Sequence, residues 1–153
     1  MVEENQDYQI MDETVLLDSS ISEPKNGYQN QKDFTTLIAW QNAREVKLFF
    51  YKKVVPLLPA SEKYALSSQI QRAAVSITAN ISEGYGRFHY KESVQFYRIA
   101  RGSLYELKDR LITSLDLEYV DKNIAVEGFT LIEKTKISLN GFINFIRSKY
   151  EKR

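Results

Sequence analysis

The chain has 153 residues, of which 43% are hydrophobic, a formal net charge of +1 and no cysteine. This length suits one domain with a hydrophobic core, and the absence of cysteine excludes disulfides and thiolate metal sites. No apolar run approaches the roughly 20 residues of a membrane span, and the acidic, polar start is unlike a signal peptide. We therefore expect a cytoplasmic protein that does not associate with membranes.

The first 33 residues differ in charge from the rest of the chain. They hold eight acidic and two basic residues, a net charge of −6, while residues 34–153 hold 12 acidic and 19 basic residues, a net charge of +7. No sustained apolar period runs through residues 1–33, where Val15-Leu16-Leu17 is a lone cluster. We expect a flexible acidic arm over residues 1–33 and a domain over residues 34–153. Such a split indicates a body that binds polyanions, an acidic arm that masks the basic body, or merely two solvated parts.

Apolar residues at helical spacing predict a first helix over residues 34–55. Asp33, Thr35 or Thr36 is expected to cap its start. Pro56 is expected to end or kink it, because proline removes a hydrogen-bond donor and clashes with the preceding turn.

A second helix is expected over residues 61–84, with Glu62 in its first turn. Its apolar stripe consists of Leu66, Ile70, Ala73, Ile77 and Ile81. The segment Gly84-Tyr85-Gly86 then interrupts the pattern. We expect these glycines to supply the positive φ that ends the helix.

A third helix is expected over residues 90–115, with His89 as a candidate for its cap, and a fourth over residues 124–149. Four helices joined by short links predict an all-α, antiparallel, up-down-up-down four-helix bundle. Ten tyrosines and eight phenylalanines are many for such a bundle. We expect Phe88, Tyr97 and Tyr105 on outer faces, where aromatic patches favour self-association.

Residues suited to catalysis are scarce. The chain has a single histidine, His89, no cysteine and no glycine-rich phosphate loop after a strand. A lone histidine beside a turn is a poor basis for a catalytic triad, and the Glu-x-x-His pairs of a bundle metal site are absent. We therefore predict no enzymatic activity, no cofactor and no metal.

A group of polar residues lies along the second and third helices. Its members are Gln69, Ser76, Asn80, Glu83, Ser103 and Glu106. We interpret the group as structural, with Asn80 and Glu83 satisfying backbone groups of the turn and Glu83 pairing with Arg87. Such a group would fix helix register and subunit contact more than it would add stability.

Basic residues on the same two helices are the best candidates for binding. They are Arg72, Arg87, Lys91, Arg98, Arg101 and Lys108. The steps of four and seven from Arg87 through Lys91 to Arg98 would place these three on one helical face, and the last two continue the spacing. Arginine forks grip phosphate in a bidentate manner. The alternative is a solvated face with ordinary ion pairs to Glu92, Glu106 and Asp109.

Two segments, residues 76–84 (SITANISEG) and 99–107 (IARGSLYEL), also resemble the signatures of a bacterial protein family. These are the four-helix-bundle proteins of 23S ribosomal RNA intervening sequences, related to the accessory variability determinant of diversity-generating retroelements. The resemblance extends from about Phe34 to about Val120, and more loosely to the end, although Pro56 falls where the family's first helix usually continues. It implies a homopentamer around a central channel, and as ligand a structured RNA or an RNA–DNA hybrid handled with a reverse transcriptase.

Charge and resemblance together give one leading hypothesis, a non-enzymatic, oligomeric nucleic-acid-binding scaffold that prefers RNA to DNA. Its contacts would be mainly to phosphate, so affinity would exceed sequence selectivity. The alternative is a protein–protein interaction module in which aromatic surfaces bind another protein and the basic residues are incidental.

Overall fold

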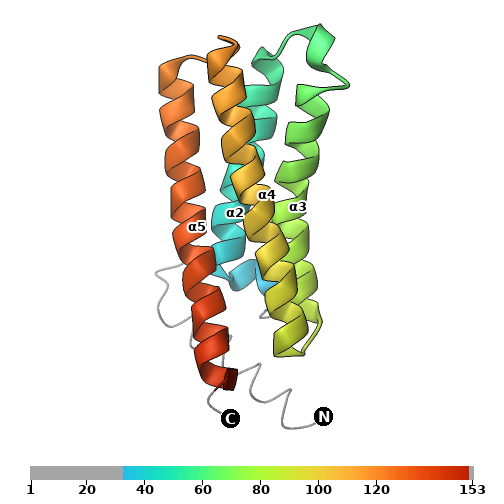
Figure 1. Cartoon of the computed structure of the whole chain (residues 1–153), viewed down its shortest axis with the longest axis vertical. Helices are drawn as coiled ribbons and strands as arrows, with labels where there is room; N and C mark the ends of the chain where they lie inside the picture. Colours follow the sequence, from blue (N-terminus) through green and yellow to red (C-terminus); the bar gives the residue numbers. More distant parts are fainter. Residues whose placement is uncertain (1–32, 152–153) are drawn as a thin grey trace.

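The computed structural model describes residues 33–151, and within them four long helices run antiparallel to one another (Figure 1). The elements are η1 (Phe34–Thr36), α2 (Ile38–Phe49), η2 (Phe50–Val54), η3 (Val55–Leu57), η4 (Ala60–Glu62), α3 (Leu66–Gly86), α4 (Tyr90–Asp116) and α5 (Lys122–Glu151). Each long helix packs on the next, and α5 returns to α2, so α3 and α5 face each other across the core. The predicted all-α, up-down-up-down bundle is therefore confirmed. The arm expected over residues 1–33 lies, apart from Asp33, outside the described residues.

The first predicted helix is helical over nearly its whole expected length but is not regular. Asp33 caps its start, because the Asp33 side chain accepts a 2.9 Å hydrogen bond from the Thr35 amide. After α2 the backbone widens into the π-helical η2 and then tightens into the 3₁₀ turn η3, which contains Pro56. The proline thus ends the helical stretch, as predicted, through a change of helix type.

The second predicted helix begins later than expected. Residues 60–62 form the 3₁₀ turn η4, and α3 starts at Leu66 rather than Ser61. Glu62 lies just before the helix, where its Oε2 accepts a 3.0 Å hydrogen bond from the Leu66 amide. Its Oε1 accepts a 3.3 Å hydrogen bond from the hydroxyl of Tyr119, in the α4–α5 connection. Burial, together with the Glu62 carboxylate, raises the pKa of Tyr119.

The turn between α3 and α4 corrects the expected role of the glycines. Gly84 and Gly86 both lie inside α3, and no described glycine has a positive φ. Phe88 takes the left-handed conformation instead, with φ 53°. Gly84 is required for space, because a Cβ there would lie 2.7 Å from Tyr97 Cε1 and 3.0 Å from Phe96 Cβ. The small residue therefore allows α3 and α4 to approach closely.

The last two helices begin and end within two residues of their predicted bounds. In the connection before α5, Asp121 Oδ1 accepts a 2.9 Å hydrogen bond from the Ile124 amide, and Glu118 has φ 61°. Gly128 is again needed for space, since a Cβ there would lie 2.5 Å from Leu111 Cδ2 and 2.7 Å from Phe49 Cε1.

Tyr97 was predicted on an outer face, and this prediction is wrong. The residue is fully buried, with its ring 5.0 Å from that of Phe142. Its position belongs to the core stripe of α4 together with Ala100 and Leu104, and this packing outweighs the polarity of its hydroxyl. Phe88 and Tyr105 are exposed as predicted, at 49% and 52%. Among residues 33–151, none of the helices has both the length and the apolar character to cross a membrane.

Candidate nucleic-acid interface

Four of the six predicted binding residues lie on one flank of α4. We call Lys91, Arg98, Arg101 and Lys108 the basic flank; successive members are seven, three and seven residues apart, which keeps them on one side of a helix. The flank borders α5, because Arg101 Nη1 donates a 3.0 Å hydrogen bond to Asn140 Oδ1 on that helix. Lys91 and Lys108 are exposed, and the two arginines are partly buried.

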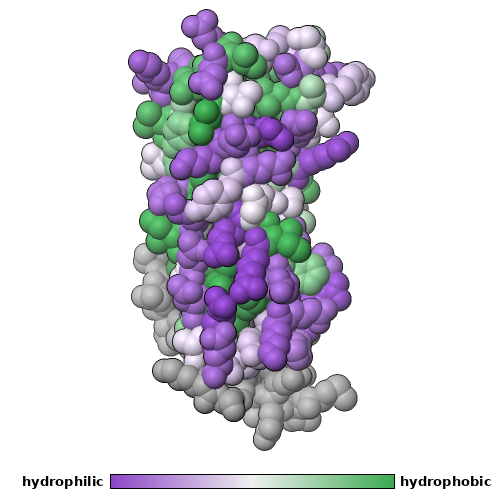
Figure 2. All heavy atoms as spheres, in the orientation of Figure 1, coloured by the Kyte–Doolittle hydropathy of each residue, from purple (hydrophilic) through white to green (hydrophobic). Residues whose placement is uncertain are grey.

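Three members of the basic flank have no ion-pair partner in the part of the chain that the structure describes. Within residues 33–151, Lys91, Arg98 and Lys108 make no ion pair. No other residue in this part of the chain neutralises their charges by an ion pair. Figure 2 shows hydrophilic side chains over much of the face that α4 and α5 present, with hydrophobic residues between them.

The facing helix α5 adds one cation that sequence reasoning missed, Lys136. Lys136 Nζ lies 5.7 Å from the centre of the Tyr105 ring and 2.7 Å from Glu133 Oε2. The hydrogen bond to Glu133 raises the pKa of Lys136, and partial desolvation opposes this shift. Lys134 instead reaches toward α2, where it pairs with Glu45 at 3.6 Å. The helical period of α5 was visible in the sequence, but which of its flanks faces α4 was not.

The other two predicted binding residues lie elsewhere. Arg87 follows the last residue of α3 and pairs with Glu83 at 2.8 Å and Glu92 at 3.6 Å. The prediction that Arg87 shares one helical face with Lys91 and Arg98 is wrong, because the helix breaks between them. Arg72 is exposed on α3, the helix diagonal to α5. Neither residue belongs to the basic flank.

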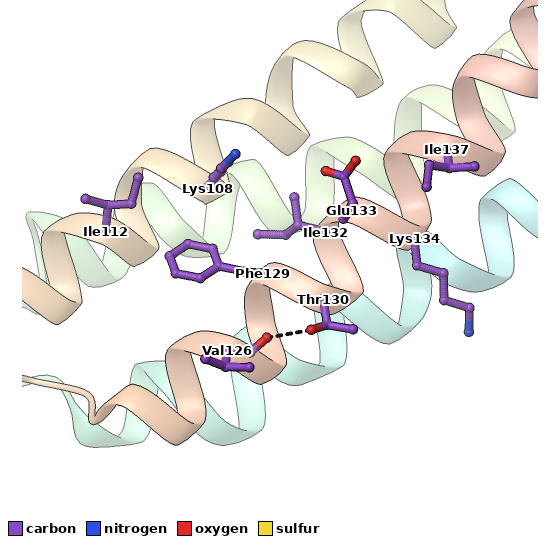
Figure 3. Close-up of a pocket in the computed structure, with 9 residues that line it drawn as sticks. All are labelled: Lys108, Ile112, Val126, Phe129, Thr130, Ile132, Glu133, Lys134 and Ile137. Carbon is purple, nitrogen blue, oxygen red and sulfur yellow. Dashed lines mark hydrogen bonds between the residues drawn. The ribbon is translucent and has the colours of Figure 1, made fainter.

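An open, mostly apolar groove of about 750 Å³ adjoins the basic flank between α4 and α5 (Figure 3). Ile112 of α4 and Val126, Phe129, Ile132 and Ile137 of α5 supply its apolar lining, with Lys108, Thr130, Glu133 and Lys134 around them. Ile112, Val126 and Ile137 are exposed at 41%, 62% and 63%. Exposed aliphatic residues gathered at one groove are typical of a protein interaction site.

Half of the predicted polar group forms a network between α3 and α4. Ser76 Oγ and Ser103 Oγ are hydrogen-bonded at 2.8 Å. Asn80 Nδ2 donates to the Ser76 carbonyl at 2.8 Å and to Ser76 Oγ at 2.9 Å. Asn80 therefore bonds within α3 and to the serine that contacts α4. The prediction that it satisfies backbone groups of the turn is wrong.

The remaining polar residues are not part of this network. Glu83 pairs with Arg87, as predicted. Glu106 lies 3.6 Å from Arg110, which also approaches Asp109 at 3.2 Å. These two acids were predicted as alternative partners for the basic candidates, but Arg110 takes both. Gln69 is exposed near the start of α3.

A search of protein families finds a match with the family described as 23S rRNA-intervening sequence protein, over residues 35–141. The chain belongs to this family. The family match contains the whole basic flank and the polar network, and it ends within α5 at Gly141. No curated protein matches the chain. Within residues 33–151, no three histidine, aspartate or glutamate side chains gather closely enough to hold a metal ion.

Proposed function

We propose that this protein is a non-enzymatic, oligomeric scaffold whose basic flank binds the phosphates of structured RNA. The observation that carries the proposal is the charge of Lys91, Arg98 and Lys108, which lie along one side of α4 and pair with no other residue of the described range 33–151. A track of cations spaced along a helix suits a phosphate backbone, and phosphate contacts position a nucleic acid without reading its sequence. The family description refers to 23S rRNA and so favours RNA over DNA as ligand.

Self-association would raise the affinity of the basic flank for RNA. Several copies in one assembly turn later binding steps into intramolecular ones, so weak sites add up to strong binding. The groove beside the flank, with Ile112, Val126 and Ile137 exposed, supplies apolar surface for contact with a second copy. By family resemblance we propose a ring of five. An RNA–DNA hybrid handled with a reverse transcriptase is the corresponding proposal for a retroelement setting.

The test is a charge reversal on the basic flank, in the full chain. Lys91→Glu/Arg98→Glu reverses two cations that make no ion pair within the described residues. Binding to a structured RNA is followed by fluorescence anisotropy between 50 and 200 mM salt. Wild-type affinity should fall steeply with salt, and the double variant should lose about two units of the log–log salt slope.

A matched control variant distinguishes the effect of charge on the basic flank from the effect of net charge. Arg72→Glu/Lys52→Glu changes the net charge equally, at two exposed positions away from the basic flank. Stronger loss in the flank variant, with an unchanged oligomer, supports the proposal. Equal loss in both variants refutes a site on α4, and no RNA binding by the wild type at low salt refutes the function.

A second candidate function, protein–protein interaction without nucleic acid, is favoured by the groove alone. Val126 and Ile137 are 62% and 63% exposed, so Val126→Ser/Ile137→Ser should leave the monomer fold intact. If this variant changes the oligomeric state in light scattering while the wild type binds no RNA, the second candidate is the better one.

A further inference from the structure

Aromatic rings cluster at the α3–α4 turn, at one end of the bundle. The ring of Tyr90 stacks on that of Tyr150, with centres 4.8 Å apart and planes 7° from parallel. The His89 ring stacks more loosely on Tyr90, at 6.2 Å and 20°. His89 itself is exposed. The cluster therefore joins the start of α4 to the end of α5 and presents an imidazole ring to solvent.

Phe88, next to this cluster, is held in a conformation that a bulky side chain rarely adopts. Its φ is 53° and its side chain is 49% exposed. Glycine takes this backbone conformation without strain, whereas phenylalanine does not. Strained residues of this kind cluster at ligand sites, and the exposed Phe88 ring lies where a ligand can contact it.

Positive charge lies beside the rings. Lys91 is exposed, makes no ion pair within the described residues, and is the first member of the basic flank. The Arg87 guanidinium lies 5.0 Å from the centre of the Phe96 ring and is held by two carboxylates. Lys91 is therefore the cation at the turn that a ligand can contact. A nucleic acid bound along the basic flank would reach Lys91 at the start of α4.

We infer that Phe88 and His89 stack on unpaired nucleobases of the RNA, with Lys91 contacting an adjoining phosphate. The inference rests on the proposed function and adds the class of RNA: one with a loop, bulge or single-stranded end. In a duplex both faces of a base are already stacked, so only an unpaired or terminal base is free to join an aromatic ring. Stacking on aromatic side chains tolerates any base, which agrees with binding that is not sequence-selective.

The experiment compares two RNAs on the full chain. One is a hairpin whose unpaired loop contains a fluorescent adenine analogue, and the other is a duplex of the same length whose two ends are closed by non-nucleotide linkers. Phe88→Gly removes the ring and is compatible with the observed φ, so the variant should fold, which circular dichroism checks. Phe88→Gly and His89→Ala should each weaken loop binding about tenfold and reduce quenching of the analogue, while duplex binding changes less than twofold.

Tyr64→Ala is the matched control. Tyr64 is 86% exposed and has Lys63 Nζ 5.3 Å from its ring centre. It lies just before α3 begins, at the end of that helix away from the α3–α4 turn. Loop binding by this variant should equal that of the wild type. If Phe88→Gly and His89→Ala bind the loop RNA like the wild type, or weaken loop and duplex equally, the inference is overturned while the proposed function stands. If the wild type binds neither RNA, both fail.

Discussion

Gly84 offers the sharpest test of how α3 and α4 are packed. A Cβ at this position would lie 2.7 Å from Tyr97 Cε1, 3.0 Å from Phe96 Cβ and 3.1 Å from the Ser93 carbonyl oxygen. Ordinary carbon–carbon contacts are about 3.5–4.0 Å. Two of these three atoms are close to or part of the backbone, and the Tyr97 ring is fixed in the core against Phe142. Gly84→Ala therefore forces α3 and α4 apart.

The expected effect is the balance of two opposing terms. Overpacking of a core costs about 1–3 kcal/mol, and replacing glycine with alanine inside a helix stabilises it by about 1 kcal/mol. Gly84→Ala should thus be neutral to destabilising by about 2 kcal/mol. Gly102 and Gly141 are exposed helical positions with nothing within 4 Å of an added Cβ. Alanine at either should stabilise the bundle by up to about 1 kcal/mol.

Urea unfolding followed by far-UV circular dichroism measures the free energy of unfolding of all three variants. Gly84→Ala should be about 1–3 kcal/mol less stable than Gly102→Ala, a gap set by the overpacking term. Equal stabilisation by alanine at positions 84, 102 and 141 would show that the close α3–α4 approach at Gly84 is not real.

Three further predictions concern single side chains. Tyr97→Ala should cost about 3–5 kcal/mol because the ring is buried, whereas Tyr105→Ala should cost about 1 kcal/mol or less, both by urea unfolding. Ser103→Ala removes the 2.8 Å bond to Ser76 and should lower the free energy of unfolding by about 1 kcal/mol; no change would mean that the network is only incidental. Burial, together with Arg44, lowers the pKa of Lys47 from its ordinary 10.5, so its charged form is disfavoured in the folded state. Lys47→Met should therefore raise the melting temperature at neutral pH. As the pH rises toward 10.5, Lys47 loses its proton in the folded protein before it does so in the unfolded chain, which stabilises the wild type. The advantage of the methionine variant should shrink over this pH range.

Local features of the fold followed from the sequence. The bounds of α4 and α5, the Asp33 cap and the Glu83–Arg87 pair depend on residues a few positions apart. A helical period and a capping side chain act over one or two turns, so the chain order alone reveals them. The start of α3 was missed because η4 and the Glu62 hydrogen bonds replace a regular first turn.

Features that depend on a neighbouring helix were decided by tertiary structure. A period shows which residues of α4 share a face, but it does not show which face meets α3, which meets α5 and which meets water. That choice buried Tyr97 and brought Lys136 over Tyr105. The close approach of α4 also explains Gly84, because a side chain at this position would collide with α4. The sequence thus determined four helices and a surplus of positive charge, and packing decided which cations stand together.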